Sequence, residues 1–81
     1  MNAATASLNE VVALVEEVIG TSGLTPESNF FEIGGDSLTV AHLSLLIEER
    51  FGTGVDVFTL YAAEDLREIH QALLESVEDA A

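Results

Sequence analysis

The chain has 81 residues, the size of one small domain, and no cysteine that could form a disulfide or a thiolate metal site. Its 15 acidic residues face only two basic ones, which gives a formal net charge of −13 at pH 7. This charge argues against nucleic acid and anionic membranes as partners, because both attract basic patches, and it favours partner proteins with basic surfaces.

The first predicted helix covers residues 7–19. Ser7 and Glu10 match the capping-box pattern at its start, and Gly20 ends it. Its apolar residues recur at helical spacing and predict one buried face: Leu8, Val11, Val12, Val15, Val18 and Ile19, with Leu14 beside them. We expect residues 1–6 before this helix, and residues 78–81 at the other end of the chain, to be frayed.

A long connection follows, from residue 20 to residue 36. Loops of this length tend to be functional or disordered. The large apolar residues of this one predict that it is ordered and packed on the core: Leu24, Phe30, Phe31 and Ile33. Within it, Thr25 and Pro26 are typical of the cap and first residue of a short helical turn.

The second predicted helix runs from about Ser37 to Phe51, ends at Gly52, and carries two lines of apolar residues. The first line has the spacing of a core face: Val40, Leu43, Ile47 and Phe51. The second line is rotated away from the first and is extended by two acids: Leu38, Ala41, Leu45, Glu48 and Glu49. Either both lines are buried or the second waits for a partner. We favour the partner, because few other elements remain to cover this line.

A short helix is predicted next. Residues 55–61 favour a strand by propensity, but a lone strand has no neighbour with which to pair. We therefore expect extended chain at Val55 and then one or two helical turns that bury Phe58, Leu60 or Tyr61.

The last predicted helix covers about residues 64–77. Glu64 and Asp65 in its first turn suit the helix dipole, whereas Ala63 is a poor cap. Its buried stripe is Leu66, Ile69, Leu73 and Val77, with Leu74 beside it. The sequence thus predicts an all-α fold in a single domain over residues 1–81. We expect a small four-helix bundle, with three main helices, one short helix and a long ordered loop between helices one and two.

The hydroxyl of Ser37 is open to three interpretations: a helix cap, a nucleophile, or an attachment point displayed to another protein. A nucleophile needs a base within reach. His42 lies about 140° around the helix from Ser37, and His70 is more typical of a partly buried structural histidine. With Asp36 available as the cap, display is the favoured interpretation.

Two other kinds of chemistry find little support in the sequence. The letters Gly35-Asp36-Ser37-Leu38 echo the Gly-Asp-Ser-Leu esterases, but those enzymes are much longer and no strand precedes the serine here. No cluster of histidine and cysteine and no calcium-loop pattern is present, so no metal site is predicted.

The stretch Phe30-Phe31-Glu32-Ile33-Gly34-Gly35-Asp36-Ser37-Leu38 resembles the phosphopantetheine attachment motif of acyl and peptidyl carrier proteins. The similarity covers almost the whole chain and includes the order and lengths of the helices. It implies that a phosphopantetheinyl transferase moves 4'-phosphopantetheine from coenzyme A to Ser37, with Mg²⁺ held at the transferase and Asp36 in contact with that enzyme. The thiol of this arm carries acyl or aminoacyl groups as thioesters, so the resemblance implies a non-catalytic carrier.

The resemblance also implies a surface for partner enzymes, which are adenylation, condensation, ketosynthase or other tailoring enzymes. The matching residues are Leu38, Ala41, Leu45, Glu48 and Glu49. Phe58 either joins this surface or lies in the core.

The branch of the family stays open. The double glycine and the pair of phenylalanines resemble peptidyl carriers of nonribosomal peptide assembly, and the charge favours a free-standing monomer. Residues 1–20 lack the basic start of a secretory signal, and the absence of cysteine fits a cytoplasmic protein. The alternatives are an acyl carrier of fatty-acid or polyketide synthesis and, from another class, an unmodified acidic helical adaptor.

Overall fold

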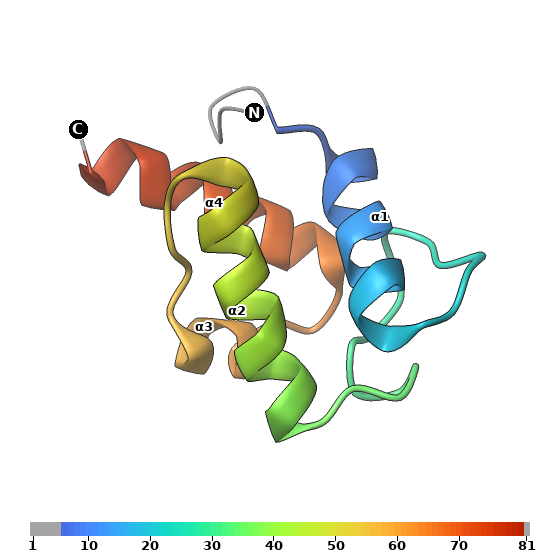
Figure 1. The fold of residues 1–81 in the computed structure, drawn as a ribbon. Helices are drawn as coiled ribbons and strands as arrows, with labels where there is room; N and C mark the ends of the chain where they lie inside the picture. Colours follow the sequence, from blue (N-terminus) through green and yellow to red (C-terminus); the bar gives the residue numbers. More distant parts are fainter. Residues whose placement is uncertain (1–5, 81) are drawn as a thin grey trace.

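Four α-helices make up the regular structure of residues 6–80, the part of the chain that the computed structural model describes (Figure 1). They are α1 (Leu8–Ile19), α2 (Ser37–Phe51), α3 (Val57–Ala62) and α4 (Leu66–Ala80). α1 packs against α2 and α4, and the short α3 also packs against α2 and α4. The predicted bundle of three main helices and one short helix is therefore confirmed. None of the described helices is long and apolar enough to cross a membrane.

The first helix begins and ends at the residues that the sequence indicates. The backbone N–H of Glu10 donates to the Ser7 hydroxyl oxygen over 3.1 Å, and the N–H of Ser7 donates to the Glu10 carboxylate over 3.3 Å, which completes the capping box. Gly20 ends the helix in the left-handed region, at a φ of 82°, and its N–H donates to the Glu16 carbonyl. Both ends are thus fixed by local hydrogen bonds.

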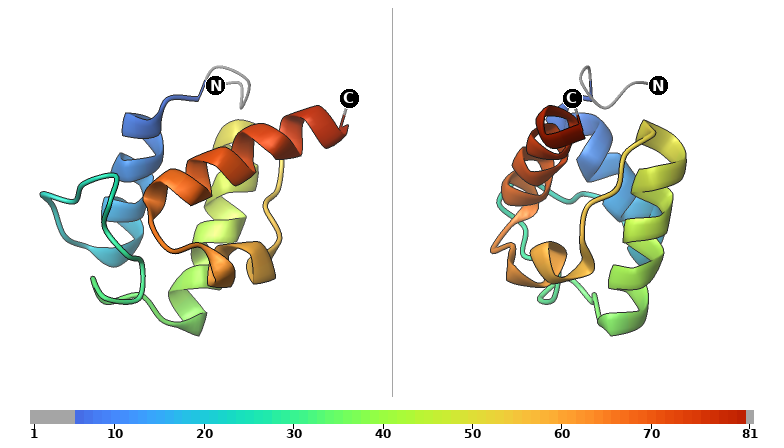
Figure 2. Two further views of the ribbon diagram at one scale, coloured as in Figure 1. Left: turned by 180° about the vertical axis from the view of Figure 1, so that it is seen from behind. Right: turned by 90° about the vertical axis from the view of Figure 1, so that its left-hand side faces the viewer.

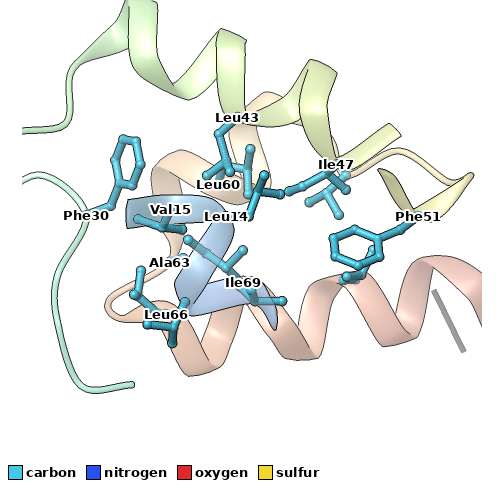
Figure 3. Packing of buried hydrophobic residues seen from close by; sticks show 14 of the residues in the cluster. Leu14, Val15, Phe30, Leu43, Ile47, Phe51, Leu60, Ala63, Leu66 and Ile69 are labelled. Carbon is cyan, nitrogen blue, oxygen red and sulfur yellow. The ribbon is translucent and has the colours of Figure 1, made fainter. Parts of the chain in front are cut away.

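The core is a single apolar cluster built from all four helices and from the loop before α2 (Figure 3). α2 contributes the predicted line, and all four of its residues are buried: Val40, Leu43, Ile47 and Phe51. Phe30 from the loop is 1% exposed, and Leu60 from α3 is equally buried. Leu14, expected only beside the buried face of the first helix, is also buried.

The start of the last helix differs from the prediction. α4 begins at Leu66, so Glu64 and Asp65 precede the helix. The Asp65 carboxylate accepts a hydrogen bond from the N–H of Glu68 over 3.1 Å. Carbonyl oxygens of Ser28 and Pro26 accept from the N–H groups of the first two helical residues over 3.1 and 3.2 Å. The long loop therefore helps to cap α4, because these N–H groups have no partner within the helix.

The short turn predicted at Thr25 is present in the loop. Thr25–Ser28 forms a hydrogen-bonded turn, in which the N–H of Ser28 donates to the Thr25 carbonyl over 3.0 Å. Ala6 is buried, while residues 1–5 and 81 and the side chains of residues 77–80, Val77 among them, lie outside the description. Of the three α3 residues offered for burial, Leu60 is the buried one, which confirms the prediction, while Phe58 and Tyr61 are exposed.

Candidate functional site

The start of α2 is organised by a capping box between Asp36 and Thr39. The N–H of Thr39 donates to the Asp36 carboxylate over 2.9 Å, and the N–H of Asp36 donates to the Thr39 hydroxyl oxygen over 2.7 Å. The hydrogen bonds that Asp36 accepts, first that from the Thr39 backbone and then that from its side chain, hold the pKa of Asp36 below its usual value. Asp36 therefore caps the helix as an anion.

Ser37 is the first residue of α2 and is exposed to solvent. Because Asp36 provides the cap, the Ser37 hydroxyl does not have to satisfy the N–H groups of the first turn. Figure 2 shows this start of α2 at the end of the bundle opposite to the end of α4. The start of α2 thus lies at one extremity of the fold.

The two histidines lie in other settings. His70 is partly buried, and its Nε2 lies 3.0 Å from the carbonyl oxygen of Ala6, which fits the structural role predicted for it. His42 is exposed further along α2. No group of three or more acidic or histidine side chains in the described part of the chain is arranged to hold a metal ion.

The loop reaches Ser37 through a tightly packed glycine. A Cβ atom built on Gly35 would lie 2.2 Å from two ring carbons of Phe30 and 2.6 Å from its carbonyl oxygen. The N–H of Gly35 also donates to that carbonyl over 2.9 Å. Only glycine fits at position 35, because any side chain there would overlap Phe30. The sequence around Gly35 does not reveal this requirement.

Asn29 holds the loop to the segment between α3 and α4, and sequence reasoning missed it. Its side-chain oxygen accepts from the N–H groups of Phe31 and Glu32 over 2.9 and 3.0 Å. Its side-chain nitrogen donates to the Glu64 carbonyl over 2.8 Å. The local signal was an asparagine before a turn, a common position for such a side chain. The link to Glu64 has no signal in the local sequence.

The second apolar line of α2 is exposed, so the alternative in which both lines are buried is wrong. Leu38 is 78% exposed, Leu45 is 55% exposed, and Ala41 lies between them in the open. The acids that extend the line are also exposed: Glu48 and Glu49. Phe58 on the adjacent α3 is 75% exposed, which excludes the core role considered for it.

An aromatic contact joins the loop to α3. The ring of Phe31 stacks on that of Tyr61, with 5.7 Å between centroids and 9° between planes, and it meets Phe30 edge to face. Both stacked rings keep part of their surface exposed. The loop is therefore attached to α3 as well as to the core.

Both arginines of the chain are paired with acids. Arg50 donates to both carboxylate oxygens of Glu17 over 2.9 Å and joins α2 to α1. Arg67 donates to the carboxylate of Asp65 over 2.8 Å, and this hydrogen bond lowers the pKa of Asp65. Since the chain has no lysine, its surface charge is almost wholly acidic.

Comparison with known proteins gives one family and several relatives. The family model described as "Phosphopantetheine attachment site" matches residues 9–73. A polyketide synthase-nonribosomal peptide synthetase from Aspergillus clavatus is 40% identical over 63 residues, which are 75% of this chain and 2% of that protein. Polyketide synthase PksN from Bacillus subtilis is 33% identical over 67 residues, which are 83% of this chain and 1% of PksN.

A third relative is the hybrid PKS-NRPS synthetase TAS1 from Pyricularia oryzae. It is 44% identical over 57 residues, which are 63% of this chain and 3% of that protein. The chain therefore spans only a few hundredths of the length of these curated relatives. No solved structure matches the chain.

Proposed function

The chain belongs to the family of phosphopantetheine attachment domains, which are non-catalytic carriers with covalently attached 4'-phosphopantetheine, and we propose that Ser37 is its attachment residue. One observation carries this proposal most strongly. The exposed Ser37 hydroxyl stands at the start of α2, where Asp36 already provides the cap. The family's chemistry needs such an accessible hydroxyl.

The helix start favours a phosphodiester on Ser37, whereas the neighbouring Asp36 carboxylate opposes it electrostatically. The helix start favours an anion, because the first N–H groups and the helix dipole point toward it. In the transfer, Ser37 Oγ forms a bond to the phosphorus of the pantetheine phosphate, and the bond between the two phosphates of coenzyme A breaks. The nucleotide leaves with its phosphates, and the serine proton passes to a base of the transferase. The attached arm then supplies a thiol that holds a cargo as a thioester.

We assign the partner surface to the exposed line of α2 and to Phe58 on α3. The line consists of Leu38, Ala41, Leu45, Glu48 and Glu49. Apolar side chains bordered by acids suit partner enzymes with an apolar centre and basic surroundings. The phosphopantetheinyl transferase and the adenylation, condensation, ketosynthase or tailoring enzymes of a synthase are the proposed partners.

The carrier's pathway is proposed as nonribosomal peptide or hybrid peptide–polyketide synthesis. The relatives from Aspergillus and Pyricularia are named as hybrid synthetases, which supports this assignment. The relative from Bacillus is named as a polyketide synthase, which supports an acyl carrier as the second candidate. Incubation of the modified chain with an amino-acid-adenylating enzyme and with an acyltransferase separates the two by which enzyme loads it.

Modification at Ser37 is tested by incubating the chain with coenzyme A and a broad-specificity transferase and then measuring its intact mass. We expect a gain of one phosphopantetheinyl group, which disappears in Ser37→Ala. Ser22→Ala is the matched control, because Ser22 is another exposed serine, in the loop between α1 and α2. A chain that gains no mass with an active transferase would support the unmodified adaptor.

A further inference from the structure

We infer that Asn29 is a positioning residue for the modification of Ser37, an inference that rests on the proposed function. Asn29 does not lie at the attachment site. It acts by fixing the loop that precedes α2 to the segment between α3 and α4. The start of α2 then has a defined place relative to α3, whose exposed Phe58 belongs to the proposed partner surface.

The side chain of Asn29 makes hydrogen bonds in two directions. Its oxygen accepts from two consecutive backbone N–H groups, those of Phe31 and Glu32. Its nitrogen donates to the Glu64 carbonyl over 2.8 Å, across 35 residues of sequence. One planar amide thus joins the bend of the loop to the segment before α4, next to the backbone hydrogen bonds that the Ser28 and Pro26 carbonyls accept from the start of α4.

The contacts of Asn29 affect the position of Ser37 through the few residues that lie between them in the chain. Phe30, the residue after Asn29, is buried in the core, and its carbonyl accepts from the N–H of Gly35. Gly35 lies so close to Phe30 that a side chain at this position would overlap the Phe30 ring. Asp36 follows directly and caps α2. A displacement at Asn29 therefore moves the residues on which the Ser37 backbone depends.

Two side-chain contacts between the loop and the segment from α3 onward differ in how much they depend on direction. The hydrogen bond from Asn29 to the Glu64 carbonyl depends on direction, whereas the Phe31–Tyr61 stack depends on it much less. The Phe31–Tyr61 stack is apolar and partly exposed, and stacked rings can slide over one another at little cost. Removal of the Asn29 amide leaves this stack and the buried Phe30 in place. The chain should stay folded while the loop shifts relative to α3.

The test compares transferase kinetics for Asn29→Ala and Asn29→Asp with those of the unchanged chain. The aspartate substitution keeps an acceptor for the loop N–H groups but removes the donor to the Glu64 carbonyl. Because a misplacement of about 1 Å can cost on the order of a hundredfold in rate, we expect both substitutions to lower kcat/KM by about tenfold or more. The loss of kcat/KM should come mainly from a higher KM, since the surface on which the transferase docks is misplaced.

Ser76→Ala is the matched control for general loss of stability. Ser76 donates to the Gly54 carbonyl over 2.7 Å and contacts Thr53 over 2.8 Å, beyond the other end of α2. This variant should lose stability but keep the transferase kinetics of the unchanged chain. An equal loss of kcat/KM in Ser76→Ala would overturn the inference, as would unchanged kinetics in Asn29→Asp.

Amide hydrogen exchange gives a readout that does not depend on the transferase. The Gly35 N–H, bonded to the Phe30 carbonyl, should exchange faster in both Asn29 variants, while the core amides of α2 keep their protection. Unchanged exchange at Gly35 would contradict the positioning role. If the unchanged chain is never modified, the proposed function fails instead, and the exchange data still decide whether Asn29 positions the loop.

Discussion

At the start of α2, the cap and the exposed hydroxyl belong to two different residues, Asp36 and Ser37. A serine at a helix start usually serves as the cap through its hydroxyl. Here Asp36 and Thr39 complete the capping box, and Ser37 lies one position inside the helix. Ser37→Ala therefore removes a hydroxyl without removing a cap. This makes it a clean test of modification, because a loss of modification cannot be ascribed to a loss of the helix.

At Gly35, even the methyl side chain of alanine should destabilise the fold. A methyl group in Gly35→Ala would overlap the Phe30 ring, which is buried and cannot turn aside freely. Overpacking of this kind costs about 1–3 kcal/mol. We expect urea denaturation to show a loss of that size in the free energy of unfolding, with slower modification of Ser37 because the loop is displaced.

Gly54→Ala is the control for this substitution. A Cβ atom there would meet only the Glu48 carboxylate, at an ordinary 3.6 Å. Its free energy of unfolding should stay close to that of the unchanged chain. Equal losses in the two variants would mean that glycine flexibility in general, rather than the contact with Phe30, explains the effect at Gly35.

At the scale of the element, α2 carries one buried face and one exposed face, and the exposed face is the proposed partner surface. Leu43 is fully buried in the core, whereas Leu45 on the other face is 55% exposed. Leu45→Arg should leave the thermal midpoint almost unchanged, because no core contact is lost. It should slow loading by partner enzymes, because it places a cation in the surface proposed to meet their basic groups. Loading rates and a melting curve measure the two effects.

Leu43→Ala is the opposite substitution on the same helix. It should cost about 2–5 kcal/mol in the free energy of unfolding, since it leaves a cavity in the core. If Leu45→Arg destabilises the chain as much as Leu43→Ala, the division of α2 into a core face and a partner face is wrong.

Elements with strong local patterns could be predicted, and those that depend on distant contacts could not. The buried line of α2 follows from its spacing alone, and both ends of α1 follow from adjacent capping residues. The start of α4 depends instead on carbonyls of Pro26 and Ser28, which reach it only in the folded chain. The six-residue α3 is too short for its pattern to show which face is buried, so the pattern does not assign Phe58 to core or surface.

The same distinction holds at the candidate site. Asp36 as the cap and Ser37 as the displayed hydroxyl could be inferred because both signals lie within a few residues. The roles of Asn29 and Gly35 could not, because they depend on Glu64 and on the orientation of the Phe30 ring. Sequence pattern thus indicated the candidate site, and tertiary contacts explain how its residues are held in place.

At the scale of the whole molecule, the net charge is the property that should most affect both stability and association with partners. The net charge is −13, and both arginines are engaged in ion pairs, Arg50 with Glu17 and Arg67 with Asp65. The acidic surface repels itself and weakens the folded state, but it attracts basic partners from a distance. Stability and partner association should therefore respond to salt in opposite directions.

Added NaCl provides the measurement. The Debye length falls from about 30 Å at 0.01 M to about 8 Å at 0.15 M salt. Over this range the thermal midpoint should rise, because self-repulsion is screened, while the association rate with the transferase should fall by about tenfold. An uncharged solute such as sucrose should not slow association in the same way. An association rate that does not depend on salt would contradict electrostatic steering.

The position of the modification is the most direct test of Ser37 as the attachment residue. The chain is incubated with coenzyme A and a transferase, and the intact product is fragmented in a mass spectrometer. We predict one phosphopantetheinyl group, on fragments that contain Ser37 and on none that contain only Ser28 or Ser44. The added mass on another serine, or no added mass with a transferase that modifies a known carrier, would contradict this assignment.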